Sequence, residues 1–400
     1  MAALLEGRLE GLEIDPVNEQ VRWGSIYWAK VKTIDSALDA VFLDLDGENT
    51  GILYNADVRW VDEAGTIHKG GDQAIGKRFR GGSFVAVQAK SAYLPQEQDS
   101  FGAPERKIPQ MSMDITLPGR YLIFGNMLGE NRISQRIRDK ALRKQLTDMQ
   151  NALEDIKGCI LRASAAGTQT DMLRREGKIL SGAWEDISSY FTGEEPALIA
   201  LGPNAIQRAL SDHASQRIER IEVVTMSHFH EVEDWCAIFA PDLVPKIQPV
   251  TLKNATEDLA LFHYRDIVGQ IESLFQSYAT LPHGGNLIIQ NTSALTAIDV
   301  NKGASKTSHL TLNLAAAKEI ARQIRLRNTG GIIVIDFLKS QNKQDEPHVL
   351  SALERAVQDD PCTVQIHGFT KLGLLEITRK RRTPALTERI SRKALQSALH

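Results

Sequence analysis

Two aspartates, Asp299 and Asp336, stand near the ends of apolar segments, where two carboxylates could support metal chemistry. Asp299 lies in TSALTAIDVN, and Asp336 ends the run GGIIVID. In α/β sheets, ligands bind beyond the carboxyl ends of the strands, where side chains leave the core. Two carboxylates there can hold one Mg²⁺, which takes one or two protein carboxylates and keeps several waters. On spacing alone a simpler interpretation is favoured, in which each aspartate only caps the turn after its strand, because aspartates are common at strand ends.

Two other patterns carry less weight. His228 and His230, followed by Glu231, would share one face if this segment is a strand, and could then bind a metal. Two histidines near a strand end are more often surface or hydrogen-bonded residues. The basic run at 379–382 (RKRR) could track an RNA backbone, although such runs are often only solvated.

The elements that would position the two aspartates follow an α/β pattern. Residues 284–290 (GGNLIIQ) and 331–336 (GIIVID) are compact apolar runs typical of buried strands. Between them, apolar periodicity predicts a helix that starts near Asn313 as N-cap, ends near Arg327 and stops at Gly330. Earlier in the chain we expect strands in GCILRAS, ALIALG and IERIEVVTM, and helices over 171–190 and 204–213.

The first part of the chain is rich in strand patterns. After a short strand pattern over 9–14, the runs SIYWAKVKTID, LDAVFLDL, FVAVQAK and YLIFG alternate apolar and polar residues between Trp23 and Phe124. This spacing favours a small barrel, with a long exposed loop over 96–109. Apolar residues every three to five positions over 130–157 then predict an amphipathic helix with a basic outer face.

Composition is that of an ordinary folded protein: 42% of the 400 residues are hydrophobic and 24% are charged, with a net charge of −3. No segment approaches the roughly 20 apolar residues that span a bilayer. The N-terminus lacks a basic-then-apolar secretory pattern, so we expect a cytoplasmic protein. Three widely spaced cysteines predict buried thiols rather than disulfides or a zinc knuckle: Cys159, Cys236 and Cys362.

Three long segments resemble the bacterial RNase E/G family of endoribonucleases. HGGNLIIQNTSALTAIDVNKG is similar to a family signature that ends in EALTAIDVNSG. LTLNLAAAKEIARQIRLRNTGGIIVIDF and GFTKLGLLEITRKRRTP resemble the two family segments that follow it, in the same order. GSIYWAKVKTIDSALDAVFLDLDGENTGIL, NRISQRI and GCILRASAAG are more weakly similar to the family's RNA-binding barrel and to its pocket for the RNA 5′ end.

The resemblance implies a mixed α/β, multidomain fold. An RNase H-like fold would carry an inserted OB-fold barrel and be followed by a DNase I-like α/β nuclease domain. The implied regions are 1–21 with 195–280 (RNase H-like), 22–125 (OB-fold barrel), 126–194 (5′-end-sensing region), 281–383 (nuclease domain) and 384–400 (tail).

The resemblance also assigns roles to residues. Asp299 and Asp336 would be the metal ligands, with Mg²⁺ as cofactor and Mn²⁺ as a substitute, and Asn301 would hydrogen-bond near the scissile phosphate. In the barrel, Phe42 would pack against RNA and Lys107 would hold it. Without the family match, a barrel-core phenylalanine and a loop lysine are the simpler interpretations. Arg136 and Arg162 would contact the RNA 5′ end.

The chain departs from the family pattern at several of these sites. The Arg-Thr pair of the 5′-phosphate pocket is Arg162-Ala163 here, the first of two paired arginines is Gln135, and a further arginine aligns with Thr363. Fewer fixed donors predict a weaker grip on a 5′-monophosphate. A second barrel aromatic aligns with Ile52. The Cys-Pro-x-Cys zinc link is missing, so we expect no structural zinc, and any homo-oligomer would form without it.

These observations predict a Mg²⁺-dependent endoribonuclease that hydrolyses single-stranded RNA and leaves 5′-phosphomonoester products. The altered 5′ pocket and Ile52 keep open an alternative, a weakly active or inactive RNA-binding protein on the same scaffold. A more remote alternative is an unrelated metal-dependent phosphodiesterase for small molecules. The barrel argues against it, because a small substrate needs no such platform.

Overall fold

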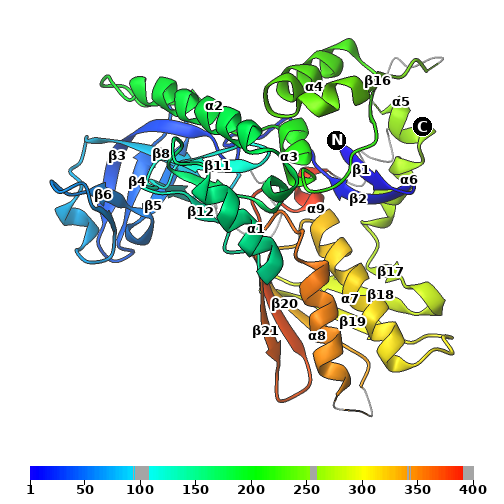
Figure 1. Cartoon of the computed structure of the whole chain (residues 1–400). Coiled ribbons are helices and arrows are strands. Elements are labelled where there is room, and N and C mark those ends of the chain that lie inside the picture. Colours follow the sequence, from blue (N-terminus) through cyan, green and yellow to red (C-terminus); the bar gives the residue numbers. More distant parts are fainter. Residues whose placement is uncertain (93, 95–107, 253–258, 340–341, 343, 391–400) are drawn as a thin grey trace. The chain divides into compact units, whose positions relative to one another are not determined.

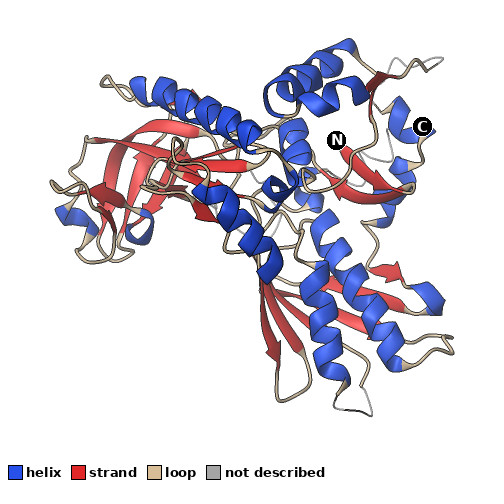
Figure 2. Cartoon of the chain, viewed as in Figure 1, coloured by secondary structure: helices blue, strands red, loops and turns tan. Residues whose placement is uncertain are grey.

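The computed structural model describes residues 1–92, 94, 108–252, 259–339, 342 and 344–390. The chain divides into two compact units (Figure 1). Unit 1 combines Met1–Ile14 with Val250–His400, and unit 2 is Asp15–Pro249. Helices and strands are mixed in both units (Figure 2), which confirms the expected mixed α/β, multidomain class.

Two expectations from composition can be compared with the structure. All three cysteines are buried thiols that form no disulfide, as predicted. Within the described part of the chain, no helix combines the length and the apolar character that crossing a membrane requires.

In unit 2, a six-stranded antiparallel sheet curls into a nearly closed barrel. Its order is β5-β4-β3-β8-β9, and β14 pairs with β3. A bridge between Ile52 and Gln110 joins β5 to the residues just before β9, so the two edges of the sheet meet. The expected small barrel is therefore confirmed. Its strands are β3 (Ile26–Asp35), β4 (Ala40–Asp44), β5 (Thr50–Tyr54), β8 (Phe84–Ala89), β9 (Met111–Ser112) and β14 (Ala197–Ala200).

Strand alternation fills the barrel with aliphatic side chains. Val41 and Leu43 on β4 and Leu53 on β5 are fully buried in one hydrophobic cluster. Between them, Phe42 is only half-buried, because successive strand residues point to opposite faces. A short hairpin follows β5, formed by β6 (Arg59–Val61) and β7 (Ile67–Lys69). The expected exposed loop over 96–109 lies almost entirely outside the described residues.

A second sheet of unit 2, in the order β10-β11-β13-β12, packs with two helices around its own core. The helix predicted over 130–157 is wrong in length. Residues 132 and 133 pair with β13, and Asp139 caps α1 by accepting a hydrogen bond from the Leu142 amide at 2.7 Å. The helix predicted over 171–190 is confirmed. The elements are β10 (Thr116–Pro118), β11 (Leu122–Gly125), β12 (Arg132–Ile133), α1 (Lys140–Asn151), β13 (Cys159–Leu161) and α2 (Thr170–Ser189).

The last part of unit 2 corrects the interpretation of the two histidines. The strand expected in IERIEVVTM ends early, as β15 (Ile221–Val223), and the Thr225 side chain then caps a helix. His228 and His230 lie on that helix, where residues two apart are about 200° apart around the axis. They therefore share no face. The other elements are α3 (Ala205–Asp212, as predicted), α4 (Met226–Phe239) and β16 (Ile247–Pro249), which pairs in parallel with β15.

Unit 1 begins with a hairpin that packs against helices from the end of the chain. Leu9 and Leu12 are buried in one cluster with Ile267, Leu326 and Leu386. The hairpin strands are β1 (Ala2–Leu5) and β2 (Arg8–Leu12), and the second of them matches the strand pattern seen over 9–14. The short helices are α5 (Ala260–Tyr264), α6 (Ile267–Ser273) and α9 (Leu386–Arg389).

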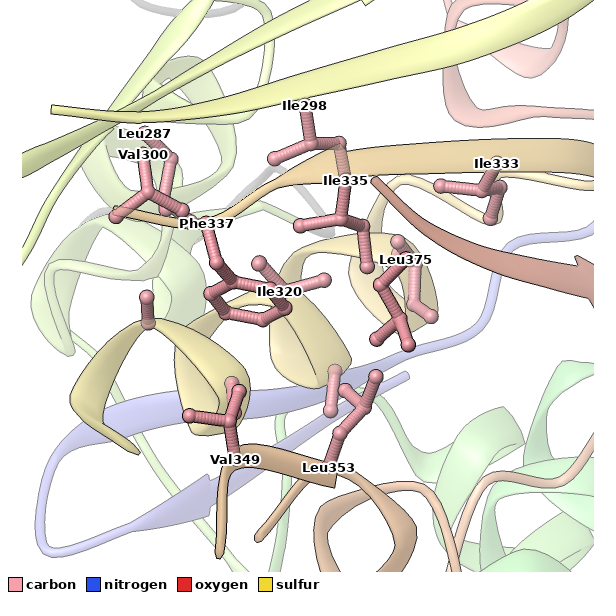
Figure 3. Close-up of a cluster of buried hydrophobic side chains, with 14 of the residues drawn as sticks. Leu287, Ile298, Val300, Ile320, Ile333, Ile335, Phe337, Val349, Leu353 and Leu375 are labelled. Atoms are coloured by element: carbon pink, nitrogen blue, oxygen red, sulfur yellow. The ribbon is translucent and has the colours of Figure 1, made fainter. Parts of the chain in front are cut away.

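The main body of unit 1 is a six-stranded sheet in the order β17-β18-β19-β20-β22-β21. Two helices, α7 (His309–Leu326) and α8 (Asp345–Ala356), lie side by side on one face (Figure 1). Figure 3 shows the core between them, where Ile298, Ile335 and Leu375 of the sheet meet Ile320 and Leu353 of the helices. The strands are β17 (Tyr278–Thr280), β18 (Asn286–Asn291), β19 (Leu295–Asn301), β20 (Gly331–Asp336), β21 (Val364–Phe369) and β22 (Leu375–Arg379).

Helix α7 lies between the two predicted apolar runs, as expected, but the run at 284–290 is β18, and the strand that α7 connects to β20 is β19. Both predicted caps are wrong. The N-cap is Ser308, whose side chain accepts a hydrogen bond from the Thr311 amide at 3.1 Å. Asn313 is buried one turn further along the helix. At the other end the helix closes before Gly330, because Asn328 already adopts a left-handed conformation with φ of 48°.

Candidate active site

Asp299 and Asp336 occupy adjacent positions on neighbouring strands. β19 and β20 are parallel, and their register pairs Asp299 directly with Asp336. Ile298, Val300 and Ile335, their neighbours in sequence, are buried under α7 and α8, so the two carboxylates project from the opposite face. Strands lie about 4.8 Å apart, which brings two aspartates within reach of one cation.

Both carboxylates are exposed and border a hollow on the open face of the sheet. The hollow has a volume of about 190 Å³. Apolar side chains of Ile288, Ala297, Val334 and Leu374 form most of its surface, and Gln290 adds an amide. The site therefore joins two acidic groups to an apolar surface, rather than surrounding them with other charges.

Asn301 lies on the same face, two residues beyond Asp299. Its Nδ2 donates a hydrogen bond to Asp299 Oδ2 at 2.9 Å. This contact restrains the Asp299 carboxylate and leaves its other oxygen available to a ligand. Because an amide nitrogen carries two hydrogens, Asn301 retains a second donor.

The start of α7 holds the chain in place just after Asp336. Asn313 Nδ2 donates to the Leu338 carbonyl at 2.8 Å, and the Leu338 amide donates to Asn313 Oδ1 at 3.1 Å. His309 Nδ1 lies 2.8 Å from the carbonyl of Lys339. Sequence reasoning treated Asn313 only as a helix cap. Its burial inside an apolar helix face was the signal that its amide bonds another segment.

The donor set suits a hard cation. Two carboxylates and an amide offer oxygen ligands, which Mg²⁺ and Mn²⁺ prefer. The described residues contain no cluster of three or more His, Cys, Asp or Glu side chains that is placed to bind a metal ion. Mg²⁺ needs no such cluster, since one or two carboxylates with waters suffice. The residues present thus fit the ion, and their role as ligands stays a prediction.

The barrel residues predicted to contact RNA are placed as follows. Phe42 lies on the outer face of β4, which excludes the interpretation that it is a barrel-core residue. It pairs directly with Ile52 on β5, whose side chain is buried. Lys107 lies outside the described residues. The outer face of β4 therefore presents one aromatic ring, with no second ring at the paired position.

The two arginines predicted for the RNA 5′ end belong to unit 2. Arg162 follows β13, donates through Nη1 to the Gly119 carbonyl at 3.1 Å, and lies 3.6 Å from Asp212. Arg136 is exposed in the turn after β12. Ala163 opens the short 3₁₀ helix Ala163–Gly167. Arg162 is thus held by contacts within the protein, and its contact with an RNA end stays a prediction.

A buried carboxylate that sequence reasoning missed lies behind Arg162. Glu176 of α2 is 4% exposed, and its Oε1 accepts hydrogen bonds from the amides of Tyr121 and Leu122, both at 2.8 Å. Burial raises the pKa of Glu176 to about 7, although these two amides and the nearby Arg162 favour the charged form. A glutamate on a helix gives no such signal in sequence.

Glu176 predicts a stability that depends on pH. Its pKa is about 7 in the folded protein and about 4.5 unfolded, so its contribution is complete below pH 4.5 and is lost as pH rises towards 7. The loss is at most about 3 kcal/mol. The glutamine of Glu176→Gln is neutral at every pH, and its carbonyl oxygen can still accept hydrogen bonds from the amides of Tyr121 and Leu122. We expect the thermal midpoint of this variant to match wild type at pH 4 and to exceed it at pH 8. Equal differences at the two pH values would contradict this.

The basic run at 379–382 does not form a solvated patch. Arg379 is 2% exposed and makes two hydrogen bonds to Asp360, both at 3.0 Å. Arg381 lies 3.3 Å from Glu388, and Arg382 lies 3.9 Å from Glu13. The first arginine of the run therefore cannot track an RNA backbone, because it is part of the protein interior.

Comparison with known proteins gives a consistent set of relatives. Residues 116–382 match the model of the Ribonuclease E/G family. The chain is 29% identical over 384 residues to "Ribonuclease G" of Salmonella typhimurium, covering 94% of this chain and 76% of the relative. It is 30% identical over 405 residues to "Ribonuclease G" of Haemophilus influenzae, covering 96% and 78%. It is 31% identical over 405 residues to "Ribonuclease E" of Escherichia coli, covering 96% of this chain and 36% of that protein.

Proposed function

The chain belongs to the Ribonuclease E/G family, and from this premise we propose that it is an endoribonuclease that cuts single-stranded RNA at a Mg²⁺ site formed by Asp299 and Asp336. The observation that carries the proposal is the direct pairing of these two carboxylates on the open face of the unit 1 sheet. Hydrolysis would leave a 5′-phosphate on the downstream product.

The proposal extends to the finer fold assignment. The barrel of unit 2 would be the OB-fold, and the sheet β17–β22 with α7 and α8 would be the DNase I-like nuclease domain. The RNase H-like part would combine residues 1–21 with 195–280. The order of elements supports this assignment, because the barrel precedes the sheet that carries the two aspartates.

Each site residue that the structure describes has a role that its geometry permits, and Lys107, which lies outside the described residues, has the role that the family resemblance implies. Asp299 and Asp336 would hold the ion, which when bound supplies an activated water and neutralises charge on the phosphate. Asn301 orients Asp299 through one N–H and can offer the other to a phosphate oxygen. Phe42 can stack on a base, which is worth about 1–3 kcal/mol per base for any sequence. Lys107 would add electrostatic attraction to the RNA backbone.

The test is a cleavage assay with a fluorescent single-stranded RNA oligonucleotide. We expect cleavage with Mg²⁺ or Mn²⁺ and none with EDTA, because the two carboxylates alone supply no activated water. Binding without cleavage in every metal would instead favour the RNA-binding alternative. Failure to bind any oligonucleotide would favour a small-molecule phosphodiesterase. Substrates with and without a 5′-monophosphate, in the same assay, measure how far the changes around Arg162 weaken recognition of that end.

A further inference from the structure

The strand register of unit 1 aligns an exposed tyrosine with the two carboxylates. Tyr278 of β17 pairs with Ile288 of β18, Ile288 pairs with Asp299, and Asp299 pairs with Asp336. Directly paired residues project from the same face of a sheet, so all four side chains share the open face. With strands about 4.8 Å apart, Tyr278 is roughly 10 Å from Asp299 along this row.

The environment of Tyr278 does not account for its aromatic ring. The residue is 51% exposed, whereas its neighbour Ala279 is 8% exposed and packs into the core. About half of this residue is in solvent, so one side of the ring contributes nothing to the packing of the fold. The ring is therefore available to a ligand on the open face.

The apolar hollow beside the carboxylates can hold part of a nucleotide, and Ile288 is the lining residue that lies between the carboxylates and Tyr278. Ile288, which separates Tyr278 from Asp299 in the row, lines the hollow together with Ala297 and Val334. These side chains form a floor that suits the flat apolar face of a base. Gln290, also in the lining, carries a donor and an acceptor that can meet a base edge. A strand whose phosphate sits at the carboxylates must place an adjoining nucleotide somewhere on this face.

We propose that Tyr278 stacks on a base next to the scissile phosphate, so that the row from Tyr278 to Asp336 holds one nucleotide of the substrate strand. The inference rests on the proposed function and adds a substrate-binding residue to it. Aromatic stacking tolerates any base, so this subsite fixes the position of the strand without selecting its sequence. Tyr278 would also give unit 1 its own contact with a base, separate from the contact that Phe42 makes on the barrel.

The experiment compares KM and kcat of Tyr278→Ala, Tyr278→Phe and Tyr278→Ile on one oligonucleotide. We expect Tyr278→Ala to raise KM by about 5- to 150-fold, the equivalent of one stacked base, with its melting temperature unchanged. Tyr278→Phe keeps the ring and should resemble wild type. Tyr278→Ile keeps strand propensity without a ring and should have the same KM as Tyr278→Ala. If the alanine variant folds poorly, the isoleucine variant replaces it in the test. Tyr264→Ala, another exposed tyrosine of unit 1, is the matched control.

Single abasic substitutions around the cut site locate the stacked base. At one position, loss of the base should impair wild type and cause no further loss in Tyr278→Ala. If Tyr278→Ala matches wild type, or every variant including Tyr264→Ala loses activity equally, the inference fails while Mg²⁺-dependent cleavage by wild type still supports the proposed function. If wild type does not cleave RNA, the result contradicts both the proposed function and the inference about Tyr278. A change in oligomeric state with unchanged KM would mean that a second copy, not RNA, covers Tyr278.

Discussion

Asp336→Asn is expected to abolish Mg²⁺-dependent RNA cleavage and to leave the fold intact. The change removes one of two paired carboxylates, and with it much of the charge that would hold the ion. Metal stabilisation of a transition state is worth several kcal/mol, so the rate should fall on the order of 10³-fold or more. The side chain is exposed, and substitutions at such positions usually alter stability by about 0.5 kcal/mol or less.

A chemically matched control separates this effect from a general change of charge. Asp359→Asn makes the same replacement at an exposed position in the segment between α8 and β21. We expect it to cleave at the wild-type rate. Both variants should melt at the wild-type temperature. If Asp336→Asn still cleaves with Mg²⁺, the reaction centre has been assigned to the wrong residues.

The segments of β18, α7 and β20 were predictable because each carries a regular signal. The apolar runs and the helical periodicity identify two strands and the helix between them, but they do not show that β19 intervenes and is the strand that runs parallel to β20. That Asp299 and Asp336 lie near the ends of two strands could be predicted. Their pairing could not, since register depends on contacts across strands that no single segment encodes. The row that leads to Tyr278 was unpredictable for the same reason.

The errors have local physical causes. The segment 130–157 is amphipathic throughout, but Ile133 and Ile137 contribute to the same core from a strand and a turn, so periodicity alone overestimated the helix. Thr225 starts a helix where apolar residues suggested that a strand continues. The burial of Glu176 and of Arg379 was not predicted, because charged residues are rarely buried. Only their partners on distant segments make such burial tolerable.

The buried pair of Arg379 and Asp360 predicts a large effect on stability. Each side chain is 1% exposed, and Arg379 Nη1 also donates to Asn328 Oδ1 and to the Thr329 carbonyl, both at 2.9 Å. Arg379→Ala would leave the Asp360 carboxylate buried without its counter-ion. Removing one partner of a buried ion pair typically costs about 3–5 kcal/mol. We therefore expect a large drop in the urea midpoint of unfolding.

Lys380→Ala supplies the comparison, because it removes the next, exposed cation of the same basic run and should shift stability by about 0.5 kcal/mol or less. If the run served mainly to bind RNA, the two variants would instead weaken RNA binding alike and leave unfolding unchanged. The double variant Arg379→Ala with Asp360→Ala removes both charges. It should lose less stability than the sum of the two single changes, since neither charge is then stranded in the interior. If the stability loss of the double variant equals the sum of the two single losses, Arg379 and Asp360 are not coupled and the loss in Arg379→Ala has another origin.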